Sequence, residues 1–171
     1  MIDPRLSRPI RRLVLAATAL ALAGQGVPGQ AARPQAVPYW ASLHWNTKRT
    51  DMANMREGPG DEYPVRRIYR RLDLPVKVVR VTEGWVRVQD PGGEQGWFIN
   101  NFVSKARTAM VTGRGAVDMR EKPDAASRLL WRLSPGLVGR LGDCREGWCR
   151  LDIDGRAGFV PAERLWGAGA P

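Results

Sequence analysis

The chain has 171 residues, with 27 lysines and arginines against 17 aspartates and glutamates, so its formal net charge at pH 7 is +10. Two cysteines and a single histidine, His44, leave too few ligands for a four-ligand metal site, and we expect no metal and no cofactor. A strongly basic chain is attracted to acidic polymers and anionic lipid, which favours an acidic surface as its partner.

The first 31 residues have the pattern of a secretory signal peptide. Four arginines within residues 1–12 precede a wholly small or apolar run over residues 13–22, and small residues then lead to a cleavage point after Ala31. The apolar run is too short to span a bilayer, which needs about 20 residues. We therefore expect an exported protein, periplasmic or extracellular, that is not an integral membrane protein after cleavage. Cleavage would lower the net charge to +7, and export makes nucleic acid a poor partner.

Three short blocks of sequence occur twice and in the same order. The pairs are residues 54–59 (NMREGP) with 118–123 (DMREKP), 83–88 (EGWVRV) with 146–151 (EGWCRL), and 96–98 (GWF) with 158–160 (GFV). Their offsets of 64, 63 and 62 residues define a repeat of about domain size. The repeat predicts a first domain over residues 38–104 and a second over residues 107–166.

Within the first copy the residues favour short β-strands. Runs rich in β-branched and aromatic residues over 76–81, 85–88 and 96–99 are separated by glycine-containing turns, and no stretch shows a sustained helical period. The polar stretch 43–54 is expected to be a first strand leading into a long loop. Short strands at this spacing predict an all-β fold with two tandem small β-barrels.

Alternation along the strands predicts which side chains face the core and which face outward. Val86 and Val88 share one face of their strand, and Trp85 lies on the opposite, polar face. In the second copy Trp148 likewise lies opposite Cys149 and its neighbours. Both tryptophans are therefore expected on the outer side of their strands.

The repeated blocks resemble the bacterial SH3-like domains of envelope proteins and cell-wall hydrolases. That family has an N-x-R-x-G-P loop, a G-W-x-x-V hairpin and a closing G-W-V/F strand, and the first copy matches all three. The second copy departs at Asp118, Lys122 and Phe159. The resemblance covers residues 38–166 and implies two tandem SH3-like barrels in an exported protein with no enzyme attached.

Two residue types stand at equivalent positions of both copies and are candidates for ligand binding. Arg56 and Arg120 are suited to holding a carboxylate, and the alternative is that each pairs with a neighbouring acid, such as Glu57 or Glu121, or caps carbonyls of its own loop. Trp85 and Trp148 are suited to stacking on sugar rings or peptide side chains, and the alternative is that they pack the domains together or plug the barrel mouth. Tyr63 is predicted to line a groove beside Trp85.

Other residues receive a structural interpretation or remain open. Trp97 and Phe159 are expected in the core. Four arginines make a basic cluster that fits either a solvated strand face or contact with an anionic wall polymer: Arg66, Arg67, Arg70 and Arg71.

Cys144 and Cys149 correspond to Val81 and Val86 of the first copy, on either side of a hairpin turn. If the two valines are cross-strand neighbours, the cysteines are too, at a separation that a disulfide can bridge. An even cysteine count in an exported chain agrees with this, and we expect a structural disulfide.

The sequence contains no recognisable nucleophile motif, and we expect no enzyme. The leading hypothesis is non-catalytic recognition of a cell-wall component, a peptidoglycan peptide, with Arg56, Tyr63 and Trp85 as the main contacts. One alternative is an adaptor or scaffold for another envelope protein. Another is a small envelope hydrolase that uses two acidic residues, which would come together only in the folded chain.

Overall fold

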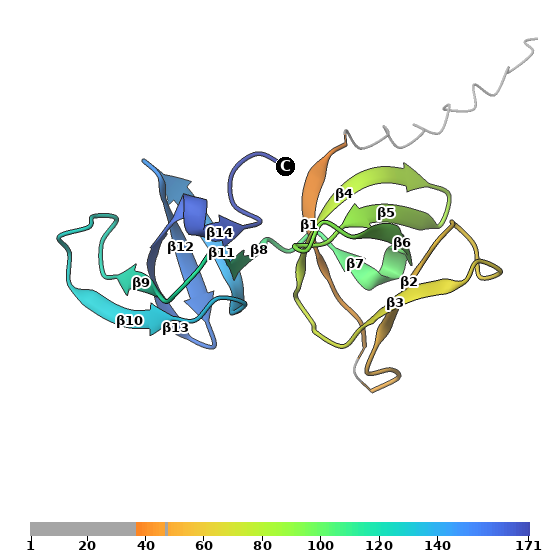
Figure 1. The fold of residues 1–171 in the computed structure, drawn as a ribbon, viewed down its shortest axis with the longest axis horizontal. Coiled ribbons are helices and arrows are strands. Elements are labelled where there is room, and N and C mark those ends of the chain that lie inside the picture. The colour runs from red at the N-terminus through yellow and green to blue at the C-terminus, as the bar shows by residue number, and fades with distance from the viewer. Residues whose placement is uncertain (1–36, 47) are drawn as a thin grey trace, which may run out of the picture. The chain divides into compact units, whose positions relative to one another are not determined.

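The structure is a computed structural model that describes residues 37–46 and 48–171 (Figure 1). The predicted signal peptide, residues 1–31, lies outside the described residues.

Residues 39–104 form a seven-stranded antiparallel sheet with the order β3-β2-β6-β5-β4-β1-β7 (Figure 1). Its elements are β1 (Tyr39–Leu43), β2 (Ala53–Arg56), β3 (Val65–Tyr69), β4 (Pro75–Thr82), β5 (Trp85–Gln89), β6 (Gln95–Ile99), the 3-10 helix η1 (Asn100–Phe102) and β7 (Val103–Ser104). We call this sheet the first barrel.

Residues 108–166 form a second seven-stranded sheet with the order β10-β9-β13-β12-β11-β8-β14. Its elements are β8 (Thr108–Val111), β9 (Val117–Arg120), β10 (Leu129–Leu133), β11 (Val138–Arg145), β12 (Trp148–Ile153), β13 (Arg156–Pro161), the 3-10 helix η2 (Ala162–Arg164) and β14 (Leu165–Trp166). Each strand stands where its counterpart stands in the first barrel. The predicted all-β fold of two tandem SH3-like barrels is confirmed.

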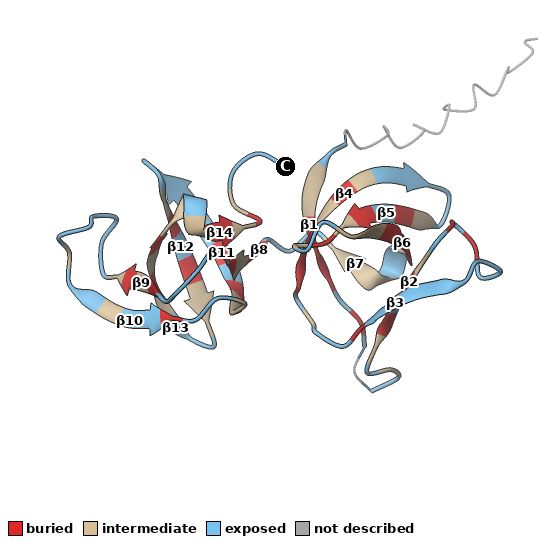
Figure 2. Cartoon of the chain, in the orientation of Figure 1, coloured by how far each residue is buried: buried red, intermediate tan, exposed pale blue. Residues whose placement is uncertain are grey.

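The strand alternation read from the sequence determines which side chains fill each core (Figure 2). Val86 and Val88 are buried in the first barrel, and Cys149 and Leu151 are buried in the second. Trp85, on the opposite face of its strand, is only half-buried. Inward-facing apolar residues at every second position provide the main stabilisation of each barrel, at about 25 cal/mol per Å² of apolar surface buried.

The prediction that the first strand begins near Leu43 was wrong, because β1 ends at that residue. Ala41 and Leu43 point into the core and are almost fully buried. The backbone N–H of Leu43 donates to the carbonyl of Leu74 at 2.9 Å, which anchors the end of the strand. The apolar segment before Leu43 therefore forms the strand, and the polar residues that follow do not.

The glycine of the third repeated block is required by a close approach of two strands. A Cβ atom at Gly96 would stand 2.4 Å from Met55 Cγ and 2.9 Å from the Arg56 carbonyl oxygen. A Cβ atom at Gly158 would stand 2.5 Å from Met119 Cγ and 2.8 Å from the carbonyl oxygen of the equivalent arginine. Both barrels thus use glycine to let β6 or β13 pass over a core methionine.

A buried carboxylate organises the β5–β6 turn of the first barrel. Asp90 is 4% exposed, and its Oδ1 accepts the backbone N–H groups of Gly92 at 2.9 Å and Glu94 at 2.8 Å. Its Oδ2 accepts the hydroxyl of Tyr69 at 2.8 Å, and the guanidinium of Arg67 lies 3.6 Å away. The carboxylate therefore joins the turn to β3 through charged hydrogen bonds.

This arrangement makes stability depend on pH in the alkaline range. Burial, and next the hydrogen bond to Asp90, raise the pKa of Tyr69 above its ordinary value of 10.0. A raised folded pKa gives stability that is complete below pH 10 and is lost as the pH rises towards the folded pKa. We expect the free energy of urea unfolding to fall more steeply above about pH 10 in the wild type than in Tyr69→Phe. Equal slopes for the two proteins would contradict this assignment.

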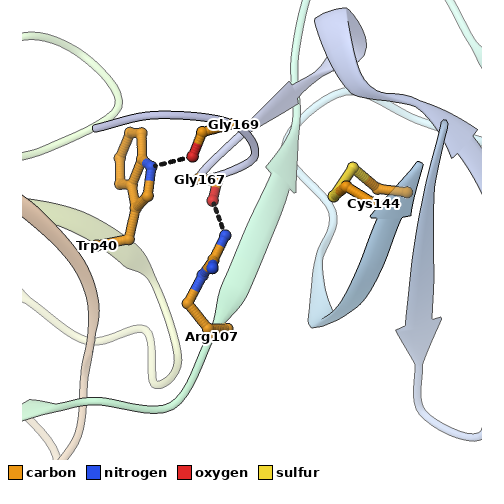
Figure 3. Close-up of a disulfide and its surroundings, with 6 residues drawn as sticks. Trp40, Arg107, Cys144, Gly167 and Gly169 are labelled. Carbon is orange, nitrogen blue, oxygen red and sulfur yellow. Dashed lines mark hydrogen bonds between the residues drawn. A yellow bond between two sulfur atoms is a disulfide. The ribbon is translucent and has the colours of Figure 1, made fainter. Parts of the chain in front are cut away.

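The predicted disulfide is confirmed. Cys144 and Cys149 face each other across the β11–β12 hairpin, at the same register position as Val81 and Val86 in the first barrel, and their sulfurs are bonded (Figure 3). The closed loop is short, so the chain-entropy contribution to the free energy of unfolding is about 2 kcal/mol.

The C-terminal tail contacts β1. The indole Nε1 of Trp40 donates to the Gly169 carbonyl at 3.1 Å (Figure 3), and its ring lies edge-on to Trp166 at 5.1 Å. In addition, the guanidinium of Arg107 donates to the Gly167 carbonyl at 3.2 Å.

Among the described residues, no helix has the length and apolar character needed to cross a membrane.

Candidate functional site

A groove of about 250 Å³ on the first barrel contains the predicted tryptophan and arginine together. Trp85 opens β5 and pairs across the strands with Ile99, and Arg56 ends β2. The groove is lined by Thr50, Met52, Asn54, Arg56, Asp61, Trp85, Ile99 and Phe102.

The second barrel has a groove of about 630 Å³ at the equivalent place. It is lined by Ala116, Val117, Asp118, Arg120, Ala125, Glu146, Gly147, Trp148, Pro161, Glu163 and Arg164. At the offsets of the repeat, seven of the eight residues lining the first groove have their counterparts in the second. Among these pairs only the arginine and the tryptophan are identical, as Arg56 with Arg120 and Trp85 with Trp148.

The two arginines perform the same structural task. Arg56 Nη1 donates to the Tyr63 carbonyl at 2.7 Å, and Arg120 Nη1 donates to the Ser127 carbonyl at 2.7 Å. Each also forms an ion pair, with Asp61 at 3.2 Å and with Asp118 at 2.7 Å. The contacts thus show each arginine capping a carbonyl of its own loop and pairing with an acid. The acids are Asp61 and Asp118, and the expected partners Glu57 and Glu121 do not fill this role. The arginine side chains remain 20% and 22% exposed, so a ligand role stays a prediction.

Both tryptophans present their rings at the grooves. Trp85 and Trp148 are half-buried, and each lines its groove. The contact of the C-terminal tail with β1 is made by other indoles, Trp40 and Trp166. A half-exposed indole beside apolar side chains has a free face for stacking.

Tyr63 is not among the residues that line the first groove. Its side chain is 41% exposed, and its ring lies against the Cα of Gly58 so closely that a Cβ there would stand 2.2 Å from it. In the second copy the pair is replaced by Lys122 and Ser127, whose Oγ accepts the Lys122 backbone N–H at 2.9 Å. The second loop therefore departs from the family pattern at two contacting positions together, with Lys122 in place of Gly58 and Ser127 in place of Tyr63. The contribution of Tyr63 to ligand binding stays a prediction.

Sequence reasoning missed the apolar floor of the first groove. Met52, Ile99 and Phe102 line it beside Trp85, and they come from the loop before β2, from β6 and from η1. Applying the repeat offset to every residue around the tryptophan would have paired these positions with Ala116, Pro161 and Arg164 in the second copy. The floor is thus apolar in the first groove and partly charged in the second.

The expectation for the barrel-closing aromatic residues holds in one copy and not in the other. Trp97 is 8% exposed and buried, as predicted. Phe159 is only half-buried and lines a hollow on the outer face of the second barrel, so its assignment to the core was wrong. Residues on this face of β13 point away from the core, because Val160 occupies the inward position.

Most of the basic cluster is paired with acids. Arg66 contacts Glu94 at 3.3 Å, and Arg70 contacts Asp51 at 2.7 Å. Arg67 forms an ion pair with Asp90, the carboxylate of the β5–β6 turn, at 3.6 Å. The contacts favour the interpretation of this cluster as a solvated strand face.

No group of three or more histidines, cysteines or acids that could hold a metal occurs within residues 37–46 and 48–171. Both grooves combine an indole and apolar side chains with charged ones, and the second groove has more charged side chains than the first. Such a surface is suited to binding an extended polymer or peptide.

The fold and the duplicated groove define a tandem pair of SH3-like barrels. The family described as bacterial SH3 domain matches the chain twice, over residues 49–104 and 114–167. The chain belongs to this family.

One curated relative is "Putative N-acetylmuramoyl-L-alanine amidase YrvJ" of Bacillus subtilis (strain 168), which is 23% identical over 131 residues. The match covers 71% of this chain and 25% of that protein, so the chain spans about a quarter of the relative's length.

The chain also matches the solved structures of NlpC2 and NlpC1 of Trichomonas vaginalis, each at a TM-score of 0.36 and 14% identity. These matches cover 76% and 79% of this chain and 48% of each of those chains. An NlpC/P60 family protein from Bacillus cereus ATCC 10987 matches with a TM-score of 0.32 and 12% identity, over 75% of this chain and 57% of that one.

Proposed function

We propose that this protein is an exported, non-catalytic binding protein that recognises a peptidoglycan peptide through the groove of its first barrel. The observation that carries the proposal is the duplicated groove, in which the same arginine and tryptophan are retained while their neighbours change. In this proposal the tryptophan contacts the ligand, and Arg56 holds the loop that forms one wall.

The chemistry of the first groove fits a peptide. The indole of Trp85 and the apolar side chains of Ile99 and Phe102 provide a floor for aliphatic or sugar C–H groups. The carboxamide of Asn54 can donate and accept hydrogen bonds, whereas the Thr50 hydroxyl already donates to the Met52 carbonyl at 3.0 Å. The Arg56–Asp61 pair leaves little net charge, so selectivity would come from shape and hydrogen bonding.

The curated relative supports the choice of ligand. That protein is named as a putative N-acetylmuramoyl-L-alanine amidase, and the muramoyl-peptide chemistry in this name suggests a wall peptide as the ligand here. Residues 49–104 and 114–167 of this chain match the bacterial SH3 domain family, and in this proposal these domains attach the protein to the wall.

The proposal predicts that Trp85→Ala weakens retention on purified peptidoglycan by about tenfold, because the stacking surface is lost. Trp131→Ala is the matched control, since Trp131 is 45% exposed on β10 and lies outside both grooves. Retention is measured by co-sedimentation, with circular dichroism to verify that both variants are folded. Equal retention of both variants and the wild type would contradict the assignment of the groove.

An adaptor role is the alternative, and the edge strands favour it. β3 and β10 end their sheets and carry exposed apolar side chains, among them Ile68 and Leu129. A partner strand can add to such an edge. Capture of an envelope protein with no retention on peptidoglycan would favour this role over the first.

A further inference from the structure

We propose that the second barrel carries a further pocket, which shares Trp148 with its groove, that binds the free C-terminal carboxylate of a cell-wall peptide. This inference rests on the proposed function for the identity of the ligand. It concerns a different surface from the groove of the first barrel.

The pocket lies on the outer face of three adjacent strands and has a volume of about 350 Å³. In the strand register Arg145 pairs with Trp148, and Arg150 pairs with Phe159. These four side chains therefore project from the same face, opposite the buried Cys149. The complete lining is Pro123, Asp143, Arg145, Trp148, Arg150 and Phe159.

The floor of the pocket is apolar and its rim is charged. Trp148 and Phe159 are half-buried, so each leaves part of a ring available for an apolar side chain. Arg145 and Arg150 are exposed, and among the described residues neither guanidinium has an ion-pair partner or a side-chain hydrogen bond. Asp143 also lines the pocket, which leaves a net charge of +1.

An anionic group beside a small apolar side chain complements this arrangement. A guanidinium binds a carboxylate through two parallel hydrogen bonds, and the aromatic floor removes the adjoining side chain from water. The C-terminal residue of a peptide presents both features on one Cα.

The corresponding face of the first barrel has different residues at two of the positions that line the pocket in the second barrel. Thr82 stands where the second barrel has Arg145, and Trp97 stands where it has Phe159. Trp97 is 8% exposed, so its indole, which is larger than the ring of Phe159, is buried in the first barrel. Only one of the two arginines has a counterpart there, Arg87. The exchange of Trp for Phe is one of the departures from the family pattern, and it is explained if the second barrel needs the extra space.

Trp148 lines both the pocket and the groove of the second barrel. A peptide with its C-terminal residue in the pocket would extend across the indole into that groove. The tryptophan would then contact the middle of the peptide, and the two arginines its end.

The test uses acetyl-Lys-D-Ala-D-Ala with a free carboxylate and the same peptide as its C-terminal amide, titrated into the protein at moderate salt by calorimetry. We expect the acid to bind about tenfold more tightly than the amide, because only the acid forms the charged hydrogen bonds. The double variant Arg145→Gln/Arg150→Gln should bind acid and amide equally, because only the groove of the first barrel then remains to bind either peptide. Arg87→Gln, the matched change in the first barrel, should keep the tenfold preference.

Equal binding of acid and amide by the wild type, or binding of neither, would overturn the inference. Loss of the preference in Arg87→Gln but not in the double variant would overturn it as well. Retention on peptidoglycan is measured in parallel. If retention persists while acid and amide bind equally, the pocket fails and the proposed function stands. If the acid is preferred and retention is absent, the pocket stands and the proposed function fails.

Discussion

Replacing Asp90 with alanine is expected to lower the free energy of unfolding of the first barrel by about 3 kcal/mol. The carboxylate is buried and accepts two backbone N–H groups of its own turn together with the Tyr69 hydroxyl. Its removal leaves three donors without their acceptor. The loss of one buried charged acceptor that serves a buried hydroxyl and two part-buried backbone N–H groups is one of the few mechanisms with an effect of this size.

Asp51→Ala is the matched control for this substitution. Asp51 pairs with Arg70 at 2.7 Å, but its side chain is 73% exposed. An exposed ion pair of this kind contributes about 0 to 1 kcal/mol. Urea denaturation, with hydrogen exchange to assign the change to β5 and β6, measures both variants. Comparable losses in the two would show that Asp90 is not the organising residue of the turn.

Gly96→Ala and Gly158→Ala are expected to destabilise their barrels by similar amounts, about 2–4 kcal/mol each. In both cases the new methyl group would overlap the core methionine and a backbone carbonyl oxygen of β2 or β9. The methionine can rotate away, but the carbonyl belongs to a paired strand and cannot move without breaking the sheet.

Gly142→Ala is the control, because a Cβ there would have its nearest contact at 3.2 Å, with Arg150 Cβ. Its effect should be below about 1 kcal/mol. Thermal unfolding followed by calorimetry measures the three variants. Stability near the wild-type value in either Gly96→Ala or Gly158→Ala would show that the strands do not approach as closely as described.

The repeated blocks allowed the fold to be predicted because they contain the residues that determine strand pairing. Alternation at Val86 and Val88 identified the core face, and the same reasoning placed Trp85 outside. The spacing of Cys144 and Cys149 around a turn predicted the disulfide. These are local patterns of period two, which the sequence displays directly.

Contacts between distant segments were not predictable in the same way. Within its own loop, carbonyl capping by Arg56 was foreseen as an alternative, but which carbonyl and which acid it contacts was not, because Tyr63 and Asp61 stand in no distinctive pattern. The Tyr69–Asp90 pair was also missed, since the repeat offset places Leu133 and Ile153 at those positions in the second copy. The second barrel thus fills the same place with apolar side chains, and a comparison of the copies shows no shared motif there.

The central claim is that the protein recognises the bacterial wall specifically, and co-sedimentation with purified peptidoglycan at low and at moderate salt tests it most directly. Attraction due to net charge alone is screened at moderate ionic strength, where the Debye length is about 8 Å. We predict that the wild-type protein stays bound when the salt is raised. Release at moderate salt, or no binding at either concentration, would contradict specific recognition of the wall.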